Sequence, residues 1–512
     1  MTGAAYIQYG RYWTRTSDPF RVKEVRYRCA NRPVVEKLNP WPAAAPSNGN
    51  KEPPQGRMEP CCPQAVRQVD VLIVGGGVSG AALLFCLARY TDLGSLLLLE
   101  KEPQLAAINS KATNNSQTIH CGDIETNYTL EKALKVKRRA DMLVRYGELL
   151  AGPERQKVLF SFPKMVLGVG ADECRFLRQR FQQFSAHFPA MELLEAEAIA
   201  HWEPAVALLE GKPRPEELVA IGIAPSASAV DYRALTESFV AQAQAAVAAS
   251  PRQLDLQLNC KVEQIQPQGE GFLVRAGGEE IAARYVVVSA GAHSLLLAQA
   301  MGYGLEYSCL PVAGSFYFTP QLLNGKVYTV QNDQLPFAAI HGDPDVLVAG
   351  KTRFGPTALL LPLLERYNPA SFWEFLKVLR LDGAVFAVFW QLFRVADIRN
   401  YIFKNLLFEV PWLRRWLFLQ DLRKIVPGAQ LGDLHFAEGY GGVRPQLIDK
   451  HNRKLLLGEA RIATDAPIVF NVTPSPGGTD CLGNAEEDLR AIVRALGCEF
   501  RAEQFEAELH GA

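Results

Sequence analysis

A glycine-rich turn and a helical pattern separate two continuous apolar runs near residue 70 of the chain. The first run is residues 71–74, and the second is the four leucines of residues 96–99. Continuous runs of this length, bounded by turn residues, are typical of strands buried on both faces of a sheet. Residues 81–90 between them are mostly apolar and predict a helix. The pattern therefore predicts a strand, a helix and a second, parallel strand.

The glycines before this helix, Gly75, Gly77 and Gly80, have the spacing GxGxxG. The first allows the tight turn, the second lets the backbone approach a pyrophosphate, and the third lets the helix pack closely on the sheet. The amides and dipole of the helix N-terminus then hold the phosphates. Glu100 ends the second run, where an acid binds ribose hydroxyls and disfavours the 2′-phosphate of NADP. We expect a dinucleotide site here, and a glycine-rich turn without a ligand is the alternative.

The later pattern indicates that the chain returns to this nucleotide sheet. Residues 130–150 and 231–249 each predict a helix, and residues 254–276 predict strands of a meander. Residues 286–294, VVVSAGAHS, predict a buried strand that ends in small residues. We expect this strand to join the nucleotide sheet and Gly291 in its turn to pack on the cofactor. The nucleotide domain is therefore predicted to be discontinuous, which is usual for FAD proteins.

Residues 311–361 carry three further strand signals, GSFYF, VYTV and VLVAG. The polar stretches between and after them are predicted to be loops. One is HGD, which contains His341, and the other is KTR, which contains Lys351 and Arg353. Residues 109–129 form a longer polar stretch that includes Ser110 and His120. A long polar loop inside a compact domain is usually functional.

Residues 372–427 are the most apolar and aromatic part of the chain, with Arg and Lys interleaved. Helices with Trp and Phe on one side and basic residues on the other lie in a membrane interface. The alternative is that the aromatic residues form a core and the basic residues a solvated rim. We predict a membrane-facing helical segment.

Length and composition set the broad class. A chain of 512 residues predicts two or three domains, and 48% apolar with 21% charged residues is an ordinary globular composition. The net charge is zero, so we expect no general attraction to nucleic acid. Ten cysteines without zinc or haem spacing predict no metal site and favour a reduced, cytosol-facing protein. Since no run of about 18 apolar residues occurs, no transmembrane helix is predicted.

The first 57 residues differ from the rest, because they begin rich in Arg and aromatic residues and become a Pro/Ala/Asn-rich linker. They lack the apolar stretch of a secretory signal, and Ser is scarcer than in mitochondrial transit peptides. We expect a poorly ordered extension, with Met58 as the functional start.

Two glycine-rich stretches near the C-terminus complete the cofactor prediction. Residues 439–450, GYGGVRPQLIDK, form a turn that presents Arg444, and residues 471–490 contain a Pro/Gly loop that opens a helix. The N-terminus of that helix would stabilise the charge that develops on a reduced flavin. Because a second GxGxxG is absent, we predict FAD and no NAD(P). The residues predicted to bind FAD are Gly75, Gly77, Gly80, Glu100, Ser110, Gly291, Gly442, Pro476, Gly477 and Gly478.

Seven stretches between about residues 68 and 490 resemble the malate:quinone oxidoreductases, which are FAD enzymes of the tricarboxylic acid cycle. They are GGGVSGAALLFCLARYT, NSKATNNSQTIHCGDIETNYTLEKA, PVAGSFYF, HGDPDV, TRFGPTALLLPLLERYN, GYGGVRPQLIDK and TPSPGG. The Ile-His-x-Gly arrangement around His120 is more distantly similar to flavin-dependent glycerol-3-phosphate and L-2-hydroxyglutarate dehydrogenases. Residues 1–57 have no counterpart in the family pattern.

The resemblance implies a peripheral membrane enzyme on the cytoplasmic face of the inner membrane. Such an enzyme oxidises (S)-malate to oxaloacetate and passes the electrons to a membrane quinone. It also implies an α/β (α+β) fold of two domains, with a Rossmann-like FAD domain of the glutathione-reductase/D-amino-acid-oxidase type and a mixed-sheet substrate domain. The alternatives are a flavin dehydrogenase of L-2-hydroxyglutarate or another 2-hydroxy acid, and a non-catalytic FAD-binding membrane protein.

We predict a division of the chain into an N-terminal extension, a discontinuous FAD domain and a substrate domain with a membrane-facing insertion. The extension is 1–65; the FAD domain is 66–125, 215–300 and 435–505; the substrate domain is 126–214 and 301–434, with the insertion at 370–427.

Oxidation of a 2-hydroxy acid needs a base for the hydroxyl proton and cations for the carboxylates. His341 is the first candidate for the base and His120 the second, because both lie in stretches predicted to be near the flavin. Arg444 and Arg353 are the candidates for the cations, since each stands among Gly or Pro, where no helix face explains a long charged side chain. Lys351 is a weaker third candidate. A structural role is the alternative for each.

Overall fold

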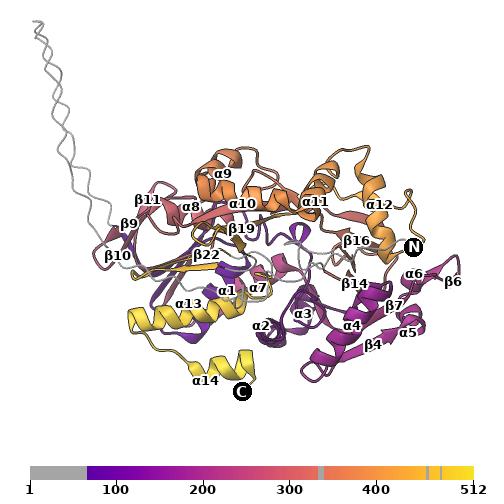
Figure 1. Ribbon diagram of the computed structural model, residues 1–512. Coiled ribbons are helices and arrows are strands. Elements are labelled where there is room, and N and C mark those ends of the chain that lie inside the picture. Colours follow the sequence, from indigo (N-terminus) through magenta and orange to yellow (C-terminus); the bar gives the residue numbers. More distant parts are fainter. Residues whose placement is uncertain (1–65, 332–339, 457–459, 473–475, 512) are drawn as a thin grey trace, which may run out of the picture.

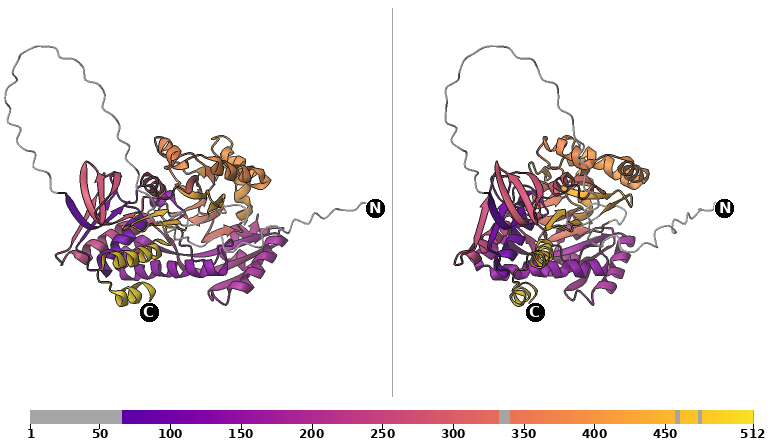
Figure 2. Two further views of the ribbon diagram at one scale, coloured as in Figure 1. Left: turned by 60° about the vertical axis from the view of Figure 1, so that its left-hand side comes forward. Right: turned by 90° about the vertical axis from the view of Figure 1, so that its left-hand side faces the viewer.

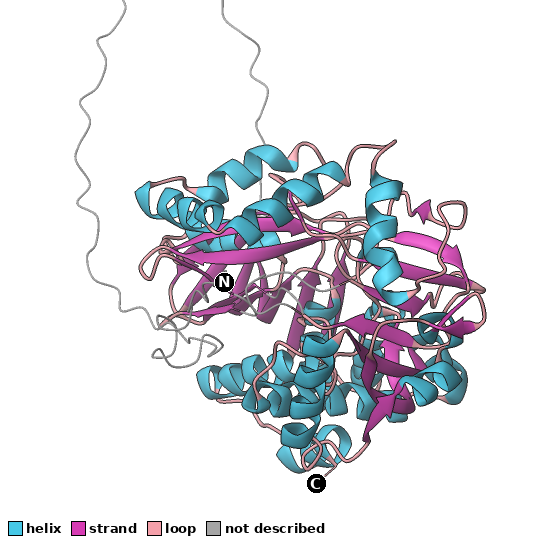
Figure 3. Ribbon diagram, turned by 45° about the vertical axis from the view of Figure 1, so that its right-hand side comes forward, coloured by secondary structure: helices cyan, strands magenta, loops and turns pink. Residues whose placement is uncertain are grey.

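The computed structural model describes residues 66–331, 340–456, 460–472 and 476–511. Its elements form two large mixed sheets, one small sheet and a two-stranded ladder, with helices on the outside (Figure 1). Figure 3 shows the strands lying between two layers of helices. The predicted extension at 1–65 lies outside the described residues.

The nucleotide sheet is built around the predicted βαβ unit. Strands β1 (Arg67–Val74) and β2 (Ser95–Leu99) are parallel and are joined by helix α1 (Val78–Tyr90). The returning strand β11 (Glu279–Val288) pairs in parallel with β1, so this prediction is confirmed. The sheet is completed by β8 (Gln253–Gln257), β9 (Val262–Gln268), β10 (Gly271–Ala276), β21 (Ala460–Ala463) and β22 (Ile468–Val472).

Both faces of the nucleotide sheet are covered. On one face, α1 packs in a continuous apolar core with other helices that come from distant parts of the chain. These helices are α2 (Leu130–Leu149), α7 (Tyr232–Val247), α13 (Cys481–Leu496) and α14 (Ala502–Phe505). On the other face, α8 (Ala292–Ala300) packs with the β9–β10 meander. The sheet is therefore buried on both sides, as its continuous apolar strands predict.

The second large sheet belongs to the predicted substrate domain and has the order β18-β13-β16-β15-β14-β3-β7-β4. Its strands are β3 (Leu159–Val169), β4 (Met191–Glu195), β7 (Leu218–Val230), β13 (Tyr317–Pro320), β14 (Lys326–Thr329), β15 (His341–Pro344), β16 (Lys351–Gly355) and β18 (His435–Phe436). Helices α3 (Gly152–Val158), α4 (Ala171–Phe184), α5 (Ala196–Trp202) and α6 (Pro204–Ala207) and the short ladder of β5 (Leu208–Leu209) and β6 (Lys212–Pro213) accompany it. The small sheet has the order β17-β12-β19-β20, formed by β12 (Tyr307–Ala313), β17 (Leu359–Leu360), β19 (Val443–Asp449) and β20 (Lys454–Leu456).

The predicted loops around His341 and Lys351 are wrong. His341–Pro344 is strand β15, Lys351–Gly355 is strand β16, and the VLVAG stretch predicted as a strand is the turn between them. The polar residues of these strands face partners inside the protein, because Asp343 pairs with Lys326 and Arg353 with Asp345. These buried ion pairs gave the two segments the polar composition of loops.

Residues 371–425 form four helices along one edge of the molecule. They are α9 (Ser371–Leu379), α10 (Gly383–Arg394), α11 (Ala396–Leu407) and α12 (Arg414–Ile425). Figure 2 shows these helices, in orange, on the side of the molecule opposite α13 and α14. Among the described residues, no helix combines the length and the apolar character needed to cross a bilayer.

The predicted domain division stays a prediction, and some ranges lie in other sheets than the division assigns. Helix α2 of the predicted substrate domain packs on α1 in the nucleotide core. Conversely, β7 and β19, from ranges assigned to the FAD domain, pair within the substrate sheet and the small sheet. The chain thus passes between the nucleotide sheet and the other sheets more often than the predicted division implies.

Candidate active site

A cavity of about 530 Å³ lies where the nucleotide sheet meets the substrate sheet. Its wall includes the turn after β1, the turn after β11 and the polar stretch 106–116. It also includes Gly442–Pro445 and Pro476–Gly478, which are far away in the sequence. The cavity therefore joins the two ends of the predicted nucleotide domain.

The turn after β1 has the geometry that the glycine pattern predicts. Gly75 has φ +114°, and a Cβ atom there would lie 2.4 Å from the carbonyl oxygen of Ser289. Gly80 does not line the cavity, but a Cβ atom at this position would lie 2.0 Å from the carbonyl oxygen of Gly75. Only glycine fits both positions, and Gly77 remains on the cavity wall at the N-terminus of α1. This cradle fits a pyrophosphate.

Glu100 lines the same end of the cavity, held by the backbone. Its two carboxylate oxygens accept hydrogen bonds from the amides of Gly76, at 2.6 Å, and Glu102, at 2.9 Å. Burial raises the pKa of this carboxyl group. The side chain is thereby fixed at the end of β2, where an acid can meet ribose hydroxyls.

Ser110 and Asn109 connect the polar stretch to two other parts of the wall. Ser110 Oγ accepts a hydrogen bond of 3.0 Å from the amide of Val78 in the first turn of α1. The side-chain oxygen of Asn109 accepts one of 3.2 Å from the amide of Val443 at the start of β19. The loop therefore holds the helix N-terminus and the Gly442–Arg444 turn against one cavity.

The opposite end of the cavity is formed by glycines that must lie close to their neighbours. A Cβ atom at Gly478 would lie 2.7 Å from the ring of Tyr232, and one at Gly442 would lie 2.7 Å from the carbonyl oxygen of Asn114. Gly291, Pro476 and Gly477 also line the cavity. Of the residues predicted to bind FAD, all except Gly80 are on the wall. Such a long glycine-lined cavity fits an extended dinucleotide.

A cluster of charged residues covers the Glu100 end of the cavity. Glu374 of α9 lies 2.9 Å from His293 Nε2 and accepts a hydrogen bond of 3.0 Å from Lys261 Nζ. Glu365 is paired with Lys101. All five side chains line the cavity. Helix α9, which was predicted only as membrane-facing, is therefore also part of the cofactor cavity.

Two of the predicted catalytic residues, His120 and Arg444, line the cavity. His120 Nδ1 lies 2.9 Å from Glu125 Oε1, and the backbone amide of His120 donates a hydrogen bond of 3.1 Å to the hydroxyl of Thr479. Burial lowers the pKa of Arg444. No side-chain hydrogen bond or ion pair joins Arg444 to another of the described residues. A half-buried guanidinium without a partner on a cavity wall is suited to bind an anion.

His341, Arg353 and Lys351 are not on the cavity wall. His341 is stacked on the ring of Tyr328 at 4.2 Å, and its Nε2 atom lies 3.2 Å from Asp343 Oδ2. Arg353 is fully buried with its guanidinium 4.6 Å from the ring of Phe316, a residue that lines the cavity. Lys351 begins β16 and is partly exposed.

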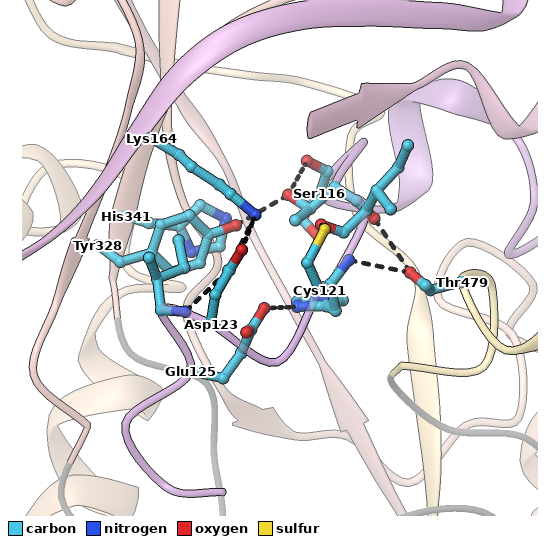
Figure 4. Close-up of polar contacts among 12 residues, drawn as sticks. Ser116, Cys121, Asp123, Glu125, Lys164, Tyr328, His341 and Thr479 are labelled. Carbon is cyan, nitrogen blue, oxygen red and sulfur yellow. Dashed lines mark hydrogen bonds and ion pairs between the residues drawn. The ribbon is translucent and has the colours of Figure 1, made fainter. Parts of the chain in front are cut away.

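Next to His120 lies a buried polar network that the sequence analysis did not identify (Figure 4). Lys164 contacts Asp123 at 2.8 Å, and the hydroxyls of Thr118 and Tyr328 are 2.8 Å apart. Lys326 donates a hydrogen bond of 3.1 Å to the Thr118 hydroxyl. A local signal existed for Asp123 and Glu125, two carboxylates three and five residues after His120 in the same polar loop. The lysines belong to strands that no short-range pattern connects to this loop.

Several known proteins are similar to this chain. The sequence matches the FAD dependent oxidoreductase family over residues 70–477. It is 47% identical over 450 residues to a probable malate:quinone oxidoreductase of Campylobacter jejuni, covering 86% of this chain and 99% of that protein. It is 44% identical over 446 residues to the malate:quinone oxidoreductase of Helicobacter pylori, covering 86% of this chain and 98% of that protein.

Solved structures share the fold. The L-α-glycerophosphate oxidase of Mycoplasma pneumoniae with FAD bound gives a TM-score of 0.57 at 19% identity, covering 83% of this chain and 95% of that one. The glycine oxidase of Geobacillus kaustophilus gives a TM-score of 0.58 at 16% identity, covering 84% of this chain and 95% of that one. FAD is the cofactor whose shape the glycine-lined cavity fits, and the predicted α/β fold of an FAD oxidoreductase is confirmed. The chain belongs to the malate:quinone oxidoreductase family of FAD-dependent enzymes.

Proposed function

We propose that this protein oxidises (S)-malate to oxaloacetate and transfers the electrons to a membrane quinone. The observation that carries the proposal is the occurrence of His120 and Arg444 on one cavity wall, with Arg444 lacking a partner among the described residues. The similar proteins of Campylobacter jejuni and Helicobacter pylori are named for malate and quinone. The L-2-hydroxyglutarate alternative has no such support.

Arg444 binds a carboxylate of the substrate in this proposal. A guanidinium can donate two parallel hydrogen bonds to a carboxylate, which fixes both the position and the orientation of the substrate. Arg353 lies one side chain behind the wall, separated from the cavity by Phe316. Its charge is matched by Asp345, so in this proposal Arg353 does not contact the substrate.

His120 accepts the proton of the C2 hydroxyl in this proposal. We favour it over His341, since His341 is covered by Tyr328 and is not on the wall. Bound FAD supplies the hydride acceptor. The amides of the turn at Gly75–Gly77, the carboxylate of Glu100 and the loop Pro476–Gly478 would hold the cofactor along the cavity. No part of this scheme uses NAD(P).

The exposed aromatic edge supports contact with a membrane. Helices α9–α12 and their connections carry large apolar side chains in contact with solvent: Trp373, Leu376, Leu381, Phe386, Trp390, Phe393, Phe403, Leu406, Leu407, Trp412 and Trp416. Apolar side chains gathered on a single surface with basic residues between them favour an interfacial position. We propose that this edge lies on the cytoplasmic face of the inner membrane, where quinone is available.

Steady-state assays of the FAD-loaded protein in lipid vesicles test the proposal. We expect (S)-malate to drive the reduction of a short-chain ubiquinone analogue, with NAD⁺ unable to replace the quinone. Arg444→Ala should keep its FAD and lose about 30- to 150-fold in kcat/KM, the equivalent of about 2–3 kcal/mol for a lost charged hydrogen-bond pair. Arg444→Lys keeps the positive charge but cannot donate two parallel hydrogen bonds, so its kcat/KM should lie between those of wild type and Arg444→Ala. Equal turnover of L-2-hydroxyglutarate and malate would contradict the assignment of the substrate.

A further inference from the structure

We infer that Glu125 is the positioning residue of the substrate-oxidising site, because it holds the proton of the His120 imidazole on Nδ1 and leaves Nε2 to accept the substrate's hydroxyl proton. This inference rests on the proposed role of His120 as the base.

The contact between the two side chains has the geometry of an orienting hydrogen bond. His120 Nδ1 lies 2.9 Å from Glu125 Oε1, and the glutamate side chain is 8% exposed while that of His120 is 15% exposed. Burial raises the pKa of Glu125, but the interactions with His120 and Lys164 outweigh burial and lower it overall. An ionised carboxylate only accepts hydrogen bonds, so Nδ1 must be the donor. A neutral imidazole that donates from Nδ1 has its lone pair on Nε2.

The backbone fixes both partners from opposite sides. The guanidinium of Arg180, from helix α4, donates to the carbonyl oxygens of Glu125, at 2.6 Å, and Tyr128, at 3.1 Å. On the other side, the hydroxyl of Thr479 accepts from the His120 amide at 3.1 Å, and Thr479 precedes α13 at the cofactor loop. These contacts hold the backbone of each residue in place.

The turn between His120 and Glu125 is equally constrained. Gly122 has φ +80°, and a Cβ atom there would lie 2.3 Å from the carbonyl oxygen of Ala133 in α2. The chain can therefore reverse direction against α2 only with glycine at this position. The close packing brings Glu125 back to the His120 ring.

A second carboxylate in this turn is neutralised separately. Asp123 is bound by Lys164 Nζ, which lies 2.8 Å from its carboxylate, and both side chains are buried. The charges of Asp123 and Lys164 therefore cancel to a large extent. Among the described residues, no lysine or arginine lies within ion-pair distance of Glu125, and its hydrogen-bonded partner is His120. This is the relationship in which a carboxylate selects the tautomer of a catalytic histidine and stabilises its protonated form.

The kinetic test uses FAD-loaded Glu125→Gln and Glu125→Asp proteins. Glutamine keeps the shape but loses the charge, whereas aspartate keeps the charge but is too short for the contact. The matched control is Glu203→Gln, because Glu203 is also a buried glutamate but is bound only by the amides of Asn324 and Gly325, away from the cavity. We expect Glu125→Gln to slow anaerobic flavin reduction by saturating (S)-malate about 10²-fold or more. The malate concentration for half-maximal rate should change less than about threefold, and the control should reduce at the wild-type rate.

The spectroscopic test needs no activity. In ¹⁵N-histidine NMR of the wild-type holoenzyme, we expect the neutral His120 ring to carry its proton on Nδ1, with its resonance assigned by its loss in His120→Gln. In Glu125→Gln the ring should shift towards the tautomer protonated on Nε2. A wild-type His120 protonated on Nε2, or a Glu125→Gln variant that reduces its flavin at the wild-type rate, would overturn the inference. If wild-type flavin is not reduced by malate, the proposed function fails, and the tautomer of wild-type His120 still decides the role of Glu125.

Discussion

Lys164 and Lys326 lie directly opposite each other on the neighbouring parallel strands β3 and β14, and both side chains are buried. Each has its own aspartate: Lys164 contacts Asp123 at 2.8 Å and Lys326 contacts Asp343 at 3.2 Å. Burial lowers the pKa of Lys326. Two adjacent buried lysines are tolerated because each positive charge is matched, and the pairs fix the sheet beside the His120 loop.

Asp343→Asn should therefore destabilise the protein strongly. The substitution leaves Lys326 buried without a counter-charge, and breaking a buried pair costs about 3–5 kcal/mol of the free energy of unfolding. The exposed pair of Asp172 and Arg175 provides the control, since Asp172→Asn should cost less than about 1 kcal/mol. Thermal unfolding of the holoenzyme measures both.

The double variant Lys326→Met/Asp343→Leu removes both charges and should recover most of the loss. Equal midpoints for Asp343→Asn and Asp172→Asn would show that Lys326 does not depend on Asp343.

The two candidate bases are separated by a pair of substitutions. His120→Asn removes the cavity-facing imidazole and should slow flavin reduction by about 10²- to 10⁴-fold, the range for general-base catalysis. His341→Asn removes a ring stacked on Tyr328, so we expect a lower unfolding temperature and less than a tenfold change in rate. Stopped-flow reduction and thermal unfolding are measured on the same preparations. The reverse pattern of rates would return His341 to the role of base.

The exposed aromatic edge should control membrane binding. Trp373, Phe386, Trp390 and Trp412 are between 59% and 80% exposed on α9, α10 and the α11–α12 connection. Replacing all four by serine should reduce partitioning to vesicles of anionic phospholipid by more than about 100-fold, because each buried side chain contributes about 1.5–3 kcal/mol. The control replaces Leu134, Leu209 and Leu305, which are exposed elsewhere on the surface.

Basic residues for a second membrane variant should be chosen from the exposed ones. Arg414 is stacked on Phe436 at 3.6 Å, and Arg415 donates to the carbonyl oxygen of Leu431, so reversing their charges would disturb the packing of α12. Arg380 and Arg394 are exposed, do not line the cavity and avoid this effect. If the four-serine variant binds vesicles as well as wild type, the exposed aromatic edge is not the membrane-binding surface.

Acid should weaken the charged cluster of Glu374, His293 and Lys261 at the Glu100 end of the cavity. The hydrogen bond from His293 and a second one from Lys261 lower the pKa of Glu374 from 4.5 to about 2. Because the pKa is lower in the folded state, the stabilisation is fully present above pH 4.5 and is lost as the pH falls towards about 2. Because Glu374 is partly exposed, we expect its charge to contribute only about 0.5–1 kcal/mol to the stability of the folded protein.

The measurement compares wild type with Glu374→Gln. The difference in FAD retention should be largest near neutral pH and should shrink below about pH 4.5, whereas exposed Glu192→Gln should match wild type throughout. A difference that stays constant down to about pH 3 would assign the effect of Glu374 to packing rather than to its charge.

The cofactor site was predictable because its signals are local. Gly75, Gly77 and Gly80 stand within six residues of one another and Glu100 ends the following strand, so short-range spacing was sufficient. His120 and Arg444 were also predicted, since each stands in an unusual polar or glycine-rich stretch that belongs to the cavity wall.

The substrate side was not predictable in the same way. His341 and Arg353 were assigned to loops because HGDP and KTRFG are short, polar stretches with glycine, although both form buried strands. Helix α2 lies in a range predicted for the substrate domain, while its apolar face packs on α1. Pairing between strands far apart in sequence leaves no periodic signal that composition can reveal.

Anaerobic reduction of the bound flavin by (S)-malate, followed by reoxidation with a quinone, tests the central claim most directly. We predict that (S)-malate bleaches the visible flavin absorbance, that (R)-malate and L-2-hydroxyglutarate do so far more slowly, and that a ubiquinone analogue restores the oxidised spectrum while NAD⁺ does not. A flavin that stays oxidised with (S)-malate, or one that is reduced as fast by L-2-hydroxyglutarate, would contradict the account.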